Sequence, residues 1–199
     1  MEDAAIVVDE VAVIPIMGAS SRRPETESLA QTLSIYRKLH FMQPPATLDG
    51  GDVMRIGRRL FVGASSRTNA EGIAQLRAFL SPFDYEVTAV EVRQCLHLKS
   101  GCSYVGRNSI LVNREMIDVT PLAEFELIDV PASDPGAANA LVIEGANEDM
   151  NEAVVIVPLA FPQTIALLEA RGFIVKALDV SEFQKAEGGV TCKSIILKG

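Results

Sequence analysis

Gly-Ala-Ser-Ser-Arg at residues 18–22 recurs unchanged at residues 63–67, which lie 45 positions further along the chain. Each copy follows an apolar run typical of a strand, over residues 11–17 and 60–62, and precedes a stretch that can form a helix. A repeat with similar flanks at a period of about 45 residues indicates an array of like supersecondary units.

The order hairpin, helix, strand continues along the rest of the sequence. Periodicity and turn residues predict helices over residues 24–37, 69–80 and 162–171, strands over 85–92 and 173–178, and hairpins over 103–112 and 140–157. We therefore expect four units, at residues 1–40, 41–93, 94–132 and 139–180, the third being the least regular. The tail is expected to add one strand, over residues 192–197, that must pair with a unit to hide its edges. No linker is visible, so residues 1–199 are expected to form one α/β domain.

The net charge and the cysteines narrow the class of protein. With 26 acidic and 18 basic residues the formal net charge is −8, so the field of the molecule repels phosphate backbones and anionic lipid. Nucleic acid and membrane partners are therefore not expected. Three cysteines are too few for a disulfide framework, the N-terminus is acidic, and no apolar run approaches a membrane span of roughly 18 residues. These features predict a cytoplasmic protein.

Histidine-dependent chemistry must use one of the two histidines, His40 or His97. His97 lies between two leucines just before a glycine loop, whereas His40 follows the expected end of the first helix and fits an ordinary structural or surface residue. Cys192 lies where a Gly-Gly loop at residues 188–189 meets the expected last strand. By itself this position fits either a reactive thiol or a buried structural cysteine.

Leu-Asp-Gly-Gly-Asp-Val at residues 48–53 places two carboxylates around glycines that let the backbone approach a ligand closely. The alternative is a plain acidic turn, and the alternating ligands of a calcium loop are absent from the sequence. Cys95 and Cys102 are too far apart for a Cys-x-x-Cys pair, and with two histidines no four-ligand zinc set is apparent. We therefore predict no metal site.

Six short strings, spread in order from the acidic pair to the C-terminus, resemble the dimethylarginine dimethylaminohydrolase family. They are Glu2-Asp3 before an apolar run, Gly-Ala-Ser-Ser-Arg-Arg at 18–23, the acidic glycine string at 48–53, Phe-Val-Gly-x-Ser-x-Arg-Thr-Asn at 61–69, Leu-His-Leu-Lys-Ser at 96–100 and Thr-Cys at 191–192. The resemblance implies the pentein fold, an α/β propeller of five modules around a pseudo-fivefold axis with the active site in the central channel. The family hydrolyses N-ω-methylated arginines to citrulline and methylamines without metal or organic cofactor, so the implied ligand is a small methylated arginine. Monomer and homo-oligomer both remain open.

The resemblance also assigns the groups that carry the reaction. Cys192 matches the nucleophile that attacks the guanidinium carbon, and His97 matches the general acid and base that protonates the leaving dimethylamine and then activates water. Asp49 matches an aspartate beside the site, which can orient His97 or the guanidinium.

Five further positions match groups that bind the substrate or hold the site together. Glu2 and Asp3 correspond to carboxylates at the guanidinium end, which fix that planar group for attack. Arg22 and Arg67 correspond to arginines that hold the catalytic constellation and the substrate carboxylate. Ala186 corresponds to a position whose backbone carbonyl lies near the substrate amino group.

The sequence departs from the family at its start, because it begins at the acidic pair and lacks the module that precedes it there. In the family that module closes the ring and carries a lid loop and a further aspartate. We therefore expect an incomplete pentein domain, with the channel open on one side and a sheet edge available for association.

Two alternatives to dimethylarginine hydrolysis follow. One is an arginine deiminase-like hydrolase. The other is an inactive pentein that acts as a binding protein, as the ribosome anti-association factors of this architecture do. Retention of Cys192 and His97 favours a hydrolase, because a binding module has no need of them, whereas an open channel favours the binding protein.

Overall fold

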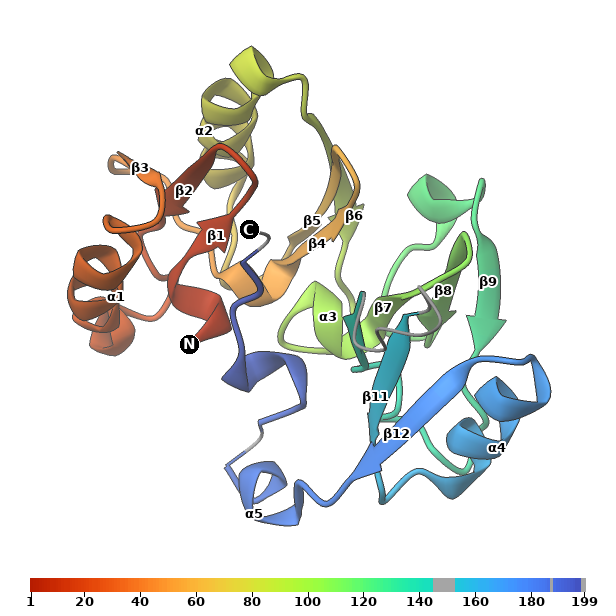
Figure 1. Ribbon diagram of the computed structural model, residues 1–199. Helices are drawn as coiled ribbons and strands as arrows, with labels where there is room; N and C mark the ends of the chain where they lie inside the picture. The colour runs from red at the N-terminus through yellow and green to blue at the C-terminus, as the bar shows by residue number, and fades with distance from the viewer. Residues whose placement is uncertain (145–152, 187, 198–199) are drawn as a thin grey trace.

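The first sheet shows how one unit is built (Figure 1). In this computed structural model, which describes residues 1–144, 153–186 and 188–197, a hairpin is followed by a helix and a return strand. The elements are β1 (Ile6–Val7), β2 (Val11–Ile14), α1 (Glu25–Leu33) and β3 (Lys38–Phe41). β1 pairs antiparallel with β2, and β3 pairs parallel with β2. A parallel return needs a crossover, which the helix supplies.

Three more sheets repeat this order, each with an antiparallel first pair and a parallel second pair. The second unit contains β4 (Val53–Ile56), β5 (Arg59–Ala64), α2 (Ala70–Leu80) and β6 (Glu86–Glu91). The third contains β7 (Cys102–Gly106), β8 (Ser109–Val112) and β9 (Glu126–Asp129). The fourth contains β10 (Leu141–Ile143), β11 (Val154–Pro158), α4 (Pro162–Ala170) and β12 (Ile174–Leu178). The four predicted units are confirmed.

Short helices precede, connect and follow these elements. They are the 3₁₀ helices Glu2–Ala4, Ser20–Arg22, Gly50–Asp52, Ser81–Phe83, Thr120–Leu122 and Thr191–Lys193, with the α-helical turns α3 (Leu98–Gly101) and α5 (Ser181–Gln184). The crossover of the third unit carries only the 3₁₀ helix Thr120–Leu122, which confirms that this unit is the least regular.

Local sequence explains where several elements begin and end. The Asn69 side chain accepts a hydrogen bond from the Gly72 amide at 2.8 Å and so caps α2. Pro162 occupies the first turn of α4, and Gly172 follows that helix with φ of +78°, a conformation that favours glycine. Arg107 and Asn108 both have positive φ in the predicted turn between β7 and β8, as a tight two-residue hairpin loop requires.

Apolar clusters join each unit to the next. Leu60, Val62 and Leu76 of the second unit pack with Val11 and Val13 of β2 in the first. Similar clusters join the second unit to the third and the third to the fourth. Each fully buried aliphatic side chain stabilises the fold by about 1.5–3 kcal/mol. Burial of apolar side chains therefore holds neighbouring units together.

The inner strands surround a channel. A cavity of about 640 Å³ is lined by residues of β1, β4, β7 and β10 together with residues 194–197. None of the helices in the described ranges combines the length and apolar composition needed to cross a membrane.

Two sequence predictions are wrong in this region of the molecule. Residues 192–197 do not form a strand: Thr191–Lys193 is a 3₁₀ helix, and Ile195 packs against the apolar cluster of the first unit without ladder pairing. A short apolar run indicates that a segment is buried, and burial alone does not distinguish a strand from an irregular segment.

The second wrong prediction concerns the first unit. The first helix ends at Leu33, so His40 lies on β3 instead of after a helix end. The tip of the predicted hairpin at residues 140–157 falls outside the described residues.

Candidate active site

A second cavity, of about 620 Å³, lies where loops of the first, third and fourth units meet the C-terminal segment. The residues expected from the sequence that border it are Asp3, Arg22, His97, Ala186 and Cys192. Glu2, Asp49 and Arg67 are not part of its wall. The fold therefore brings five of the eight expected residues to one cavity, although they come from positions almost two hundred residues apart.

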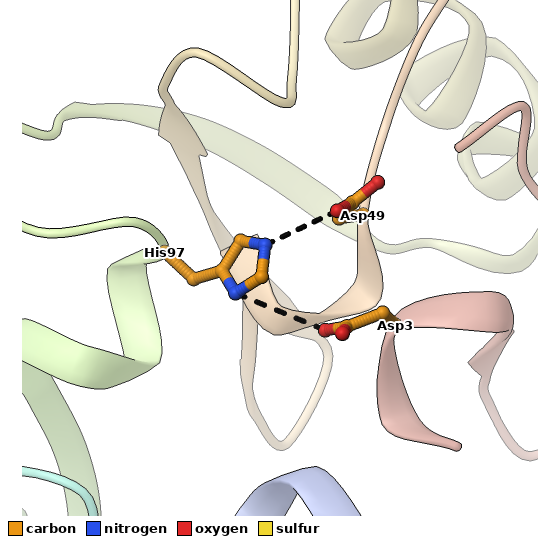
Figure 2. Close-up of side chains that lie close together, drawn as sticks. All are labelled: Asp3, Asp49 and His97. Carbon is orange, nitrogen blue, oxygen red and sulfur yellow. Dashed lines mark hydrogen bonds and ion pairs between the residues drawn. The ribbon is translucent and has the colours of Figure 1, made fainter. Parts of the chain in front are cut away.

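His97 lies between two carboxylates (Figure 2). Its Nε2 is 3.2 Å from Asp49 Oδ2, and its Nδ1 is 3.9 Å from Asp3 Oδ1. The residue is 8% exposed and immediately precedes α3. A Cβ atom at Gly51 would lie 2.7 Å from His97 Nδ1, so only glycine allows the backbone to pack against this ring.

The carboxylates decide the protonation of His97. Burial disfavours the charged imidazole, but the Asp49 hydrogen bond and the charges of Asp3 and Asp52 favour it more strongly, so the pKa of His97 is raised above its ordinary value. The ring is therefore biased toward the imidazolium, the form that can donate a proton.

Asp49 is itself held in place by the first copy of the repeated pentapeptide. The Gly18 amide donates to Asp49 Oδ1 at 2.8 Å, and the Asp49 amide donates to Thr68 Oγ1 at 3.2 Å. Asp49 is fully buried. A Cβ atom at Gly18 would lie 2.4 Å from the carbonyl oxygen of Arg67, so the two copies of the repeat meet at this glycine.

The second copy supports His97 through Asp52. Ser65 Oγ and Thr68 Oγ1 donate to Asp52 Oδ2 at 2.7 and 2.6 Å, and the Leu98 amide donates to Asp52 Oδ1 at 2.9 Å. Burial raises the pKa of the Asp52 carboxyl, while these donors favour its charged form. The residue next to His97 is thus tied to the second unit.

The adjacent acidic residues Glu2 and Asp3 have different partners. Asp3 accepts hydrogen bonds from Arg22 Nη1 at 2.7 Å and from the Gly51 amide at 3.0 Å. Burial of Asp3 opposes its charge, but the Arg22 hydrogen bond and the nearby positive groups lower its pKa below the usual range. Glu2 borders the central channel instead, where Oε1 lies 2.5 Å from Lys99 Nζ.

The positively charged side chains near the cavity also differ in position and in partners. Arg22 borders the cavity but is already paired, with Asp3 on one side and with Glu25 through two hydrogen bonds of 2.8 Å on the other. These carboxylates raise the pKa of Arg22, the Glu25 hydrogen bond most strongly. Arg67 is half-buried and lies outside the cavity wall. Lys193 does border the cavity, with Nζ 5.2 Å from the centre of the Phe183 ring.

Two of the three cysteines reach the cavity. Cys192 is half-buried on its wall, within the 3₁₀ helix Thr191–Lys193. Cys95 also borders it, and its thiol donates to the His97 carbonyl at 3.2 Å; burial raises the pKa of Cys95 to about 11. Cys102 is fully buried, which raises its pKa further.

Asp3, Asp49 and His97 also offer the kind of atoms that bind metals. One ligand atom from each lies within 4.8 Å of the others. The same atoms already take part in the contacts with Arg22, Gly18 and each other described above. The expectation of a reaction without metal stays a prediction.

Comparison with known proteins identifies the class. The arginine deiminase family model matches residues 1–157. A dimethylarginine dimethylaminohydrolase of Pseudomonas aeruginosa is 33% identical over 197 residues, 98% of this chain and 74% of that protein. One from Streptomyces coelicolor is 34% identical over 199 residues, all of this chain and 73% of that protein. The chain therefore belongs to the dimethylarginine dimethylaminohydrolase family.

The solved structures agree with this assignment. A cysteine-to-serine mutant of the Pseudomonas aeruginosa enzyme, complexed with citrulline, superposes with a TM-score of 0.86 at 32% identity, covering 96% of this chain and 72% of that one. The four units thus form a propeller-like pentein fold, as expected.

Lys193 and Asn139 are among the residues of the cavity wall that the sequence analysis did not single out. Lys193 is a lysine beside Cys192, and lysines are too common on surfaces to attract notice. Asn139 follows three small residues in a segment that separates the third and fourth units, where asparagine is an ordinary loop residue. Both were recognisable only once the cavity was known.

Proposed function

We propose that this chain hydrolyses N-ω-methylated arginine to citrulline and methylamine through a covalent intermediate on Cys192. The observation that carries the proposal is His97, buried between Asp49 and Asp3 in a cavity that Cys192 also borders. An acid–base group with two carboxylate partners beside a thiol is the arrangement that nucleophilic substitution at a guanidinium requires. The family membership supports the same reaction.

The guanidinium is a poor electrophile, because resonance spreads its charge over three nitrogens, so it must be held in one plane for attack. Asp3 supplies a carboxylate at the cavity that stays ionised, since Arg22 and the Gly51 amide support its charge. We assign to Arg22 the role of holding Asp3. Glu2 then acts on the site from the channel side through its contact with Lys99.

The reaction proceeds in two balanced steps. In the first, Cys192 reacts as its thiolate: the sulfur bonds to the guanidinium carbon, and the bond from that carbon to the methylated nitrogen breaks as protonated His97 donates its proton to the departing amine. In the second, His97 takes a proton from water, the water oxygen bonds to the same carbon, and the carbon–sulfur bond breaks. The remaining proton of the water leaves with the amine, so the products are citrulline, the amine in its ammonium form, the Cys192 thiolate and protonated His97.

The amino-acid end of the ligand lies, in this proposal, toward the C-terminal segment. Ala186 borders the cavity, and its backbone carbonyl is assigned to the substrate amino group. Arg67 is assigned to the substrate carboxylate on the family resemblance alone, since it lies outside the cavity wall.

The proposed location of the protein is the cytoplasm, because three free cysteines fit a reducing compartment.

The test is citrulline formation from asymmetric dimethylarginine and, separately, from arginine. Wild type is compared with Cys192→Ser and with Cys102→Ala, a change at a fully buried cysteine that does not border the cavity. We expect turnover of the methylated substrate that Cys192→Ser abolishes and Cys102→Ala retains. Turnover that survives Cys192→Ser would refute the mechanism, and a clear preference for arginine would assign the deiminase reaction instead. Absence of turnover in a folded wild-type protein would favour a binding role.

A further inference from the structure

We infer that Asn139 is a positioning residue, which fixes the turn that carries Cys192 relative to the turn that carries His97. The inference rests on the proposed function for these two residues. They lie on separate segments of the chain, Cys192 in the C-terminal segment and His97 at the start of the third unit. The nucleophile and the proton donor must act on neighbouring atoms of one substrate, so the two turns must be held at a fixed distance and orientation.

The Asn139 side chain bonds to both turns at once. Its Nδ2 donates to the carbonyl oxygen of Lys99 at 2.8 Å and to Thr191 Oγ1 at 2.9 Å. Its Oδ1 accepts from the Thr191 amide at 3.3 Å. Lys99 is two residues after His97, and Thr191 immediately precedes Cys192. One amide group thus uses both of its N–H donors and its oxygen to link the two turns.

The backbone beneath Asn139 is fixed to the unit that contains His97. Ala137, Ala138 and Ala140 are buried, and the Ala140 amide donates to Ser103 Oγ at 3.0 Å. Ser103 is the second residue of β7, the strand that directly follows α3. The link is therefore anchored on a strand and not on a loose loop.

An independent feature of the C-terminal segment points to the same contact. A Cβ atom at Gly189 would lie 2.2 Å from Asn139 Oδ1, so the segment approaches the amide more closely than any side chain would permit. Gly189, the second glycine of the pair before Cys192, is thereby explained: it allows the backbone to pack on the link that positions the nucleophile.

Side-chain chemistry makes the link specific. The change Asn139→Asp would remove both donors and set an oxygen against the Lys99 carbonyl, where two acceptors repel. Alanine would leave the Lys99 carbonyl and the Thr191 amide without this partner. At Thr191, valine removes the hydroxyl acceptor at nearly constant shape, whereas serine retains it.

The experiment compares Asn139→Ala, Asn139→Asp, Thr191→Val and Thr191→Ser with wild type. Asn113→Ala is the matched control, because the Asn113 side chain also bonds at both ends, to the Pro135 carbonyl and the Glu115 amide, but does not border the cavity. We expect the two Asn139 variants to lower kcat by about 10- to 100-fold, since small misplacements of reacting groups cost that much, with KM within about threefold of wild type. Thr191→Val should lose kcat in the same way, and Thr191→Ser and Asn113→Ala should retain it.

Hydrogen–deuterium exchange supplies a readout that does not need turnover. Peptides covering residues 188–197 should exchange faster in Asn139→Ala than in Asn113→Ala, at matched thermal stability. Unchanged exchange there, or full kcat in Thr191→Val, would overturn the inference. A raised KM at unchanged kcat in the Asn139 variants would also overturn it, because that pattern assigns Asn139 to direct substrate binding. If wild type lacks Cys192-dependent turnover, the proposed function fails, and the exchange experiment still decides whether Asn139 holds the segment.

Discussion

Replacing Asp49 by asparagine should lower the pKa of His97 and so shift the ring toward its neutral form. Asp49 Oδ1 accepts a hydrogen bond from the Gly18 amide, so the amide oxygen of the new side chain must stay there and its NH₂ group must face His97. That NH₂ group is a donor and sits at the position now 3.2 Å from His97 Nε2. Only an unprotonated Nε2 can accept from it.

The Asp49 hydrogen bond is the largest of the contributions that raise the pKa of His97, and the charges of Asp3, Asp52 and Asp49 add to it. Removing an opposite charge from about 4 Å typically changes a pKa by about 1–3 pH units, and each unit corresponds to about 1.4 kcal/mol between the two protonation states. Because Asp49 and His97 are buried, solvent screens this loss little. We therefore expect the pKa of His97 to fall in Asp49→Asn, because the hydrogen bond and the charge of Asp49 are both lost, while Asp3 and Asp52 still favour the charged ring.

The assay is an NMR titration of the two histidine rings, with His40 on β3 as the internal reference. The matched control is Asp134→Asn, which changes another buried aspartate, bonded to Thr164 in the fourth unit. In the control the His97 titration should be unchanged. An unchanged or raised His97 pKa in Asp49→Asn would refute the electrostatic reasoning.

The same change should alter two pH profiles. The pKa of His97 is raised on folding, so its contribution to stability is fully present below the ordinary value of 6.5 and is lost as pH rises through the folded pKa. In Asp49→Asn this contribution should shrink. Turnover that needs protonated His97 should likewise decline at lower pH in the variant than in wild type.

Two further predictions concern neighbouring groups. Gly51→Ala places a Cβ atom 2.5 Å from Asp3 Oδ1 and 2.7 Å from His97 Nδ1, so both side chains must move. We expect kcat to fall by about 10- to 100-fold in a protein that still folds. Wild-type turnover would contradict the packing argument. An amidine-based alkylating agent should label Cys192 before Cys95 and Cys102, because burial raises the pKa values of the latter two and keeps them as thiols. Mass spectrometry of the labelled peptides measures the order of labelling. Equal labelling of all three cysteines would count against a selective site.

The repeated pentapeptide has a function in the structure that its sequence did not reveal. It predicts the period of the fold, but its residues also support the site: Gly18 binds Asp49, and Ser65 binds Asp52. These two aspartates belong to the acidic glycine string between the copies. Both copies therefore converge on the carboxylates around His97, where the first and second units meet the third.

The sequence by itself determined the period of the fold, the hairpin–helix–strand order of its four units and its family. Each of these depends on local spacing: apolar periodicity selects helix or strand, and glycines and prolines mark the turns between them. It could not determine the C-terminal segment, where an apolar run predicted a strand and the structure shows a 3₁₀ helix followed by an irregular stretch.

Only the tertiary structure decided which side chains meet. Glu2 and Asp3 are neighbours in sequence, yet one contacts Lys99 at the channel and the other contacts Arg22 beside His97. Asn139 has no local signature, and its role depends on two turns that come within reach of one amide after the units have packed. Such contacts are set by the packing of whole sheets and by the approach of the C-terminal segment, so they cannot be predicted from residue spacing along the chain.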